Sequence, residues 1–188
     1  MYHLYYDIYK KKYGENIELI YSDTDSMVLK IKTEDLYKDM IDMKEIYDFN
    51  NMLNPIFLDE KKELKLNYSD NNFVLGKFKD ETKGLPIKKF IVLRSKMYAI
   101  EYEEKTEVKT CKKAKGMSKN IVKNYLYDQY SNALHKNDIK KDYMHTLRSS
   151  SHQIQGLNMY KVSLSPYDDK RYYANNIKSY PIGMYNPI

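Results

Sequence analysis

The first third of the chain alternates between helical and extended hydrophobic patterns. Apolar residues recur with helical spacing between residues 2 and 12, and Gly14 then interrupts the pattern, which predicts a short amphipathic helix. Residues 17–21 and 26–31 are two apolar runs of strand length. The four polar residues between these runs favour a tight turn, so we expect a helix followed by a β-hairpin.

The remaining two thirds also predict a mixture of helices and strands, and the expected fold class is therefore α+β. Asn and Asp are frequent in the middle of the chain, where no hydrophobic period is visible, which is typical of a connecting loop. The expected elements are a helix capped by Thr33, a loop over residues 48–72, strands over 73–78 and 87–102, a helical stretch in two pieces over 118–136, extended structure from 142 and an irregular tail over 181–188.

Composition and charge narrow the class of partner. The chain has 32 Lys and Arg against 26 Asp and Glu, a formal net charge of +6, which favours an anionic partner, with nucleic acid ahead of a membrane surface. The 21 tyrosines could stack on bases or pack a core. No apolar run is long enough for a membrane span. The single cysteine, Cys111, fits a reducing compartment, so we expect an intracellular protein, with nucleus and cytoplasm both open.

Two aspartates occupy the predicted turn. Asp23 and Asp25 are alternate residues of the hairpin tip, and a turn can bend both carboxylates toward one point. Such oxygen ligands suit Mg²⁺, which serves phosphoryl transfer when substrate phosphates complete its coordination. The alternative is an ordinary surface turn. The apolar flanks favour the metal interpretation, because a buried strand pair would need a cation to offset two adjacent carboxylates.

Residues 21–26, Tyr-Ser-Asp-Thr-Asp-Ser, resemble the Tyr-Gly-Asp-Thr-Asp-Ser palm signature (motif C) of family B DNA polymerases. Ser22 replaces a glycine that many members have, and a small polar residue fits the same hairpin. The resemblance implies that Asp23 and Asp25 are catalytic metal ligands, with Asp25 the principal one. A third carboxylate from an upstream motif would complete a site for two Mg²⁺ ions.

Downstream segments extend the resemblance over most of residues 1–171. Residues 75–81 and 90–98, the Lys115-Gly116 pair and the string at 168–171 are similar to the polymerases of viral-like mobile elements of the Polinton or Maverick type, which are related to protein-primed polymerases. The chain would then be encoded by a virus or mobile element. In this interpretation residues 1–115 are the carboxy-terminal part of a palm, an antiparallel sheet with flanking helices, and residues 116–188 are a small helical-plus-β thumb.

The family resemblance also implies a set of DNA contacts. Lys96 and Tyr98 match the family's Lys-x-Tyr motif, which holds the primer end through the minor groove, where the base pattern is nearly independent of sequence. The alternative for both residues is an ordinary strand with alternating exposure. The basic run over residues 109–123 would neutralise phosphates, its alternative being a solvated charged face. The expected DNA-binding residues are Arg94, Lys96, Tyr98, Lys113 and Lys115.

Other polymerase motifs are not found in this sequence. It lacks the upstream motif with the third carboxylate and the fingers helix that binds the incoming dNTP, and Met1 matches an internal position of the family. A truncated sequence, a decayed element, or a split enzyme with a separate upstream half would each explain this. We therefore expect a fragment of a DNA-directed DNA polymerase that acts on primer–template DNA and is inactive alone. The alternative is a non-catalytic DNA-binding protein or a relic.

Overall fold

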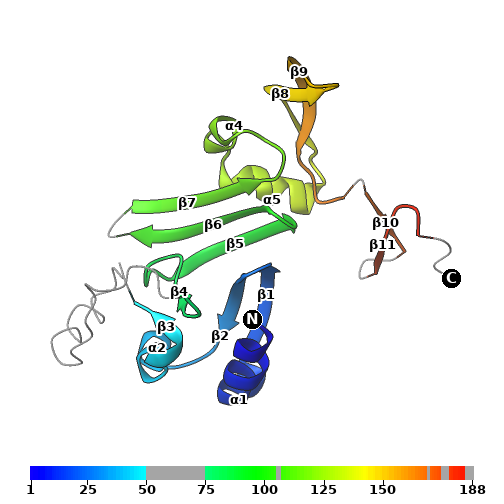
Figure 1. Cartoon of the computed structure of the whole chain (residues 1–188). Coiled ribbons are helices and arrows are strands. Elements are labelled where there is room, and N and C mark those ends of the chain that lie inside the picture. Colours follow the sequence, from blue (N-terminus) through cyan, green and yellow to red (C-terminus); the bar gives the residue numbers. More distant parts are fainter. Residues whose placement is uncertain (50–74, 105–106, 169, 175–177, 185–188) are drawn as a thin grey trace. The chain divides into compact units, whose positions relative to one another are not determined.

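The computed structural model describes residues 1–49, 75–104, 107–168, 170–174 and 178–184 (Figure 1). These residues form helices and small sheets, so the expected α+β class is confirmed. The chain divides into two compact units. The first comprises Met1–Lys88 and Tyr102–Val108, and the second comprises Lys89–Glu101 and Lys109–Ile188. The expectation of a palm followed by a thumb stays a prediction.

The first unit begins with the expected helix and hairpin. A π-helical segment, His3–Tyr9, continues into α1, Lys10–Tyr13, and a 3₁₀ turn, Gly14–Asn16, leads into β1. Strands β1, Ile17–Asp23, and β2, Ser26–Ile31, pair antiparallel as predicted. The remaining elements are α2, Leu36–Asp42, a 3₁₀ turn, Lys44–Ile46, and the short parallel pair β3, Tyr47–Asp48, and β4, Phe78–Lys79.

The second helix starts later than the sequence predicts. Thr33 was expected to be its N-cap, but the cap is Asp35, whose Oδ1 accepts hydrogen bonds from the backbone amides of Tyr37 (3.0 Å) and Lys38 (3.2 Å). Both residue types are good caps, and here the aspartate satisfies two of the free amides of the first turn. The Thr33 hydroxyl instead donates a 2.7 Å hydrogen bond to Asp39 on α2.

A single hydrophobic cluster holds these elements together. Within this cluster, the hydroxyl of Tyr9, in the first helical segment, forms a short hydrogen bond with the hydroxyl of Tyr47 of β3. Polar contacts at Asp39 add to it, since this carboxylate also accepts from Tyr13 (3.0 Å) and pairs with Lys12 (2.9 Å). The buried members are Leu4, Tyr9, Tyr13, Ile17, Met40, Ile41, Tyr47 and Phe49.

The second unit contains most of a three-stranded sheet in the order β5–β6–β7, with bounds Ile87–Arg94, Met97–Glu104 and Glu107–Ala114. The predicted extended run over 87–102 is therefore two strands. The turn between them includes Lys96, whose backbone has φ of +59°. Lysine is not a typical turn residue, which is why the pattern alone did not predict the break.

Two short helices and a long hairpin follow this sheet. The helical stretch is indeed in two pieces, α4, Lys119–Lys123, and α5, Tyr127–Lys136. Strands β8, Lys140–Ser150, and β9, Gln153–Leu164, then form an antiparallel hairpin (Figure 1). The antiparallel pair β10, Arg171–Tyr173, and β11, Ser179–Pro181, follows within the extended structure expected from residue 142. Only Pro181 belongs to the stretch that was expected to be irregular.

The core of the second unit lies between one face of the sheet and the helices. Its buried residues are Ile91, Leu93, Met97, Ala99, Ala114, Val122, Tyr125, Tyr130, Ala133 and Leu164. Two predictions lie wholly or partly outside the described residues: most of the loop at 48–72, and the start of the strand at 73–78, of which β4 contains only Phe78. The last four residues of the tail, 185–188, also lie outside them.

Candidate carboxylate pair and nucleic-acid interface

Asp23 is the last residue of β1, and Asp25 lies in the turn before β2. Figure 1 shows the hairpin that these two strands form. Asp23 pairs with Ser26, so Thr24 and Asp25 form a two-residue turn. The Ser26 hydroxyl donates to the Asp23 backbone oxygen (3.1 Å), and the Thr24 hydroxyl donates to Asp23 Oδ1 (3.2 Å). These contacts close the turn and hold the Asp23 carboxylate beside the backbone of the tip.

The backbone at this tip adopts a conformation that its sequence disfavours. Thr24 has φ of +56°, in the left-handed region, where a β-branched residue is a genuine outlier. Such a conformation costs of the order of 1–3 kcal/mol and persists only where the surroundings impose it. The strained residue separates the two aspartates, so it sets the relative direction of their side chains.

The hairpin tip is more exposed than the sequence predicts. Asp25 is exposed and Asp23 is half-buried, and along β1 only Ile17 is buried. The expectation of a buried strand pair is wrong, because the apolar residues Leu19 and Ile20 point partly to solvent around a bulge in the strand. Because Asp25 is exposed, solvent screens its charge, so repulsion between the two carboxylates does not by itself require a cation.

The carboxylate pair fits part of a magnesium site. Mg²⁺ is often held by one or two carboxylates, with water and substrate phosphates as its other ligands, and Asp23 and Asp25 supply oxygen donors of this kind. Within the described residues no group of three or more His, Cys, Asp or Glu side chains could hold a metal ion.

The predicted DNA-binding residues lie on the β5–β6–β7 sheet. One face of the sheet packs on the helices through residues such as Leu93, Met97 and Ala114. Because strand side chains alternate, Tyr98 and Lys113, each next to one of these buried residues, belong to the opposite face. Lys113 is exposed there, while Tyr98 is half-buried, with its ring 5.9 Å from that of Phe90.

The basic candidates converge at one end of this sheet. The Lys115 amide donates a 3.0 Å hydrogen bond to the carbonyl of Lys96, which brings the end of β7 beside the β5–β6 turn. Both lysines are exposed. Arg94 ends β5 at the same place, and its Nη1 lies 3.6 Å from Asp168 Oδ1, so a carboxylate accompanies this cation.

The structure adds Lys161, which sequence reasoning missed, to this group. Its Nζ donates a 3.3 Å hydrogen bond to the carbonyl of Gly116, next to Lys115. Gly116 has φ of +89°, a left-handed conformation that favours glycine, whereas the atom nearest to a Cβ there would be Lys161 Nζ, the movable end of a flexible side chain. The 45 residues that separate Lys161 from Gly116 explain why no local pattern indicated the contact.

One lysine of the predicted basic run has an internal partner. Lys112 Nζ donates to the carbonyl oxygens of Lys123 (2.9 Å), the last residue of α4, and of Tyr125 (2.6 Å), just after the helix. Carbonyls at the end of a helix need such donors. Tyr130 also fixes β7, because its hydroxyl donates to the Lys113 carbonyl at 3.1 Å. These contacts hold the strand that presents Lys113 and Lys115 against the helices.

No protein-family model, curated protein or solved structure matches this chain. The polymerase resemblance therefore depends on the motifs quoted above. Among the described residues, no helix is long and apolar enough to cross a membrane.

Proposed function

We propose that this chain is part of a DNA-directed DNA polymerase, in which it supplies one carboxylate motif and contacts to the primer–template duplex. The observation on which the proposal depends is the two-residue turn that joins Asp23 and Asp25 between two paired strands. This is the local geometry that a Tyr-x-Asp-Thr-Asp-Ser motif requires. A non-catalytic turn has no evident reason to keep a strained threonine between two acids.

The division of labour follows from the chemistry of each group. Asp25 and Asp23 would hold Mg²⁺. When bound, this ion would polarise the attacking 3′-hydroxyl of the primer and stabilise the leaving oxygen of the nucleotidyl transfer. Lys96 and Lys115 would bind phosphates as point charges, independently of base sequence. Tyr98 would meet the duplex in its minor groove. The incoming dNTP would be bound by a separate upstream half, so the chain alone is expected to be inactive.

Catalysis can be tested by adding the missing upstream half of the polymerase as a separate protein. A palm-and-fingers fragment of a family B polymerase, ending before its own motif C, would be mixed with this chain and a primer–template, and extension measured with Mg²⁺ and dNTPs. We expect extension with the unchanged chain and none with Asp25→Asn. Asp42→Asn, an exposed acid at the end of α2, is the matched control and should extend normally. Equal extension by Asp25→Asn and the unchanged chain would exclude the metal role.

One observation also favours the alternative, a DNA-binding protein without catalysis. Lys96, Lys115 and Lys161 all belong to the second unit, which has its own hydrophobic core, whereas the aspartates belong to the first. DNA binding therefore needs neither aspartate. Duplex binding that is unchanged in Asp25→Asn, together with the absence of extension under every complementation, would select this function.

A further inference from the structure

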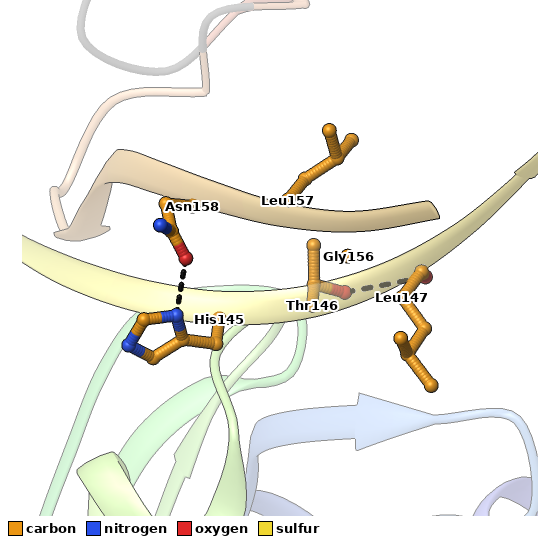
Figure 2. Close-up of a pocket in the computed structure, with 6 residues that line it drawn as sticks. All are labelled: His145, Thr146, Leu147, Gly156, Leu157 and Asn158. Atoms are coloured by element: carbon orange, nitrogen blue, oxygen red, sulfur yellow. Dashed lines mark hydrogen bonds between the residues drawn. The ribbon is translucent and has the colours of Figure 1, made fainter. Parts of the chain in front are cut away.

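The β8–β9 hairpin presents a sheet face that no described element covers. Its register places Tyr143 opposite Tyr160 and His145 opposite Asn158, and strand alternation puts these residues on one face together with Leu147 and Ile154. We call these six residues the tyrosine face. A hydrogen bond between the His145 ring and Asn158 Oδ1 crosses the two strands at its centre (Figure 2).

The exposure of this face is unusual for large side chains. Tyr143 and Tyr160 are 54% and 70% exposed, and Leu147 and Ile154 are each 77% exposed. An open concavity of about 230 Å³ lies at the middle of the hairpin (Figure 2). It is lined by residues of this face, to which Gly156 contributes a position without a side chain, and also by Thr146 and Leu157, which alternation places on the opposite face. Contiguous exposed apolar surface rimmed by polar groups commonly marks a binding site.

The charges of the hairpin indicate which kind of partner the tyrosine face would bind. Residues 143–167 contain no Asp or Glu. The one acid of the hairpin, Asp142, is at its base, where it accepts from Tyr125 and Ser163 and pairs with Lys140. A second copy of the hairpin would bring like charges together, so the charge balance favours an anionic partner over self-association.

The side chains of the tyrosine face indicate which class of anionic partner it would bind. Two tyrosine rings on one face offer stacking surfaces, and the exposed Lys141, which alternation places on the same face, offers a cation for a phosphate. Unpaired bases expose their ring faces, whereas the bases of a duplex are already stacked on one another. The carboxylate side chains that make a peptide acidic have no flat rings for the tyrosines to cover.

We propose that the tyrosine face binds single-stranded nucleic acid by stacking unpaired bases on Tyr143 and Tyr160. This site is distinct from the Lys96 and Lys115 end of the sheet, which is proposed to hold a duplex. It therefore goes beyond the polymerase function and does not depend on it.

The test measures binding of a fluorescently labelled 20-nucleotide oligothymidylate by anisotropy, with a duplex of equal length in parallel. Replacing both tyrosines, Tyr143→Ala with Tyr160→Ala, should weaken single-strand binding by about tenfold or more. The Tyr143→Phe, Tyr160→Phe pair keeps both rings and should bind within about threefold of the unchanged chain, because stacking needs the ring rather than the hydroxyl. Tyr172→Ala with Tyr173→Ala, two exposed tyrosines of β10, is the matched control.

Circular dichroism of each variant shows whether it is folded. If the alanine pair does not fold, binding by the phenylalanine pair still tests the proposal. Loss of affinity in both pairs would overturn stacking, as would unchanged affinity in the alanine pair. Failure of the unchanged chain to bind the oligonucleotide at low salt would also overturn the proposal. A dimer of the unchanged chain in analytical sedimentation that the alanine pair abolishes would also overturn the proposal, because the tyrosine face would then join two copies of the chain.

Discussion

The hydroxyl of Tyr125 donates a 2.6 Å hydrogen bond to Oδ2 of Asp142, which ties the helical segment of the second unit to the base of β8. The same oxygen accepts from the Ser163 hydroxyl at 2.6 Å, and Lys140 Nζ lies 3.1 Å from the other oxygen. Partial burial raises the pKa of the Asp142 carboxyl, but the hydrogen bonds from Ser163 and Tyr125 and the charge of Lys140 outweigh it, so the pKa is lowered overall.

Asp142→Asn should therefore lower the free energy of unfolding at pH 7 by roughly 1–3 kcal/mol, the usual loss for a hydrogen-bonded charge. A carboxyl whose pKa is depressed in the folded state stabilises above its ordinary pKa of 3.8, and this stabilisation disappears as the pH falls through the lower folded value. Urea denaturation at pH 7 and pH 3 measures it. The gap between the unchanged chain and Asp142→Asn should shrink at pH 3, and the exposed Asp138→Asn should show no gap at either pH.

The strained tip of the β1–β2 hairpin gives a second prediction. Thr24→Gly should raise the free energy of unfolding by about 1 kcal/mol, because glycine adopts the positive φ of this position without steric cost. Chemical denaturation measures the change, with Thr24→Ala as the control, because it loses the same hydroxyl but keeps a Cβ at the positive φ. A loss of stability in Thr24→Gly would show that contacts of the threonine side chain outweigh the strain.

A third prediction concerns the tip of the β8–β9 hairpin. Ser150 pairs with Gln153, so Ser151 and His152 form a two-residue loop, with φ values of +50° and +61°. Two positive φ values are typical of a type I′ turn, for which Asn-Gly is the preferred sequence. The double change Ser151→Asn with His152→Gly should stabilise the hairpin by about 0.5–1 kcal/mol.

Slower amide hydrogen exchange along β8 and β9 would report this stabilisation. Binding of single strands by the tyrosine face should stay unchanged, because the loop lies beyond Ile154 and the tyrosines. Faster exchange in the double variant would contradict the turn assignment.

Much of the secondary structure could be predicted because its determinants are local. The β1–β2 hairpin has two apolar runs around four polar residues, and the break between α4 and α5 is visible in the pattern itself. The start of α2 could not be fixed, because Thr33 and Asp35 are both good caps and the choice depends on contacts that Asp39 makes after folding.

The local sequence pattern could not predict which functional side chains lie close together in the fold. Lys96 and Lys115 were each expected to bind DNA, but their proximity depends on the strand order β5–β6–β7 and on a turn at a lysine with positive φ. Lys161 reaches the same end of the sheet only because β9 passes Gly116. The exposure of Asp25 agrees with the alternative of a surface turn, which the apolar flanks had made the less favoured one, because the bulged strand leaves Leu19 and Ile20 partly in solvent.

Binding of a primer–template duplex by this 188-residue chain most directly tests the nucleic-acid interface on which the proposed function and its alternative both depend. The affinity should fall steeply with salt, and Lys96→Ala with Lys115→Ala should reduce the slope of log K against log salt by about two, roughly one for each phosphate that is no longer neutralised. Lys11→Ala with Lys30→Ala removes the same charge from the first unit and should leave the slope unchanged. A chain that does not bind the duplex at low salt, or equal slopes in the two double variants, would contradict the proposal.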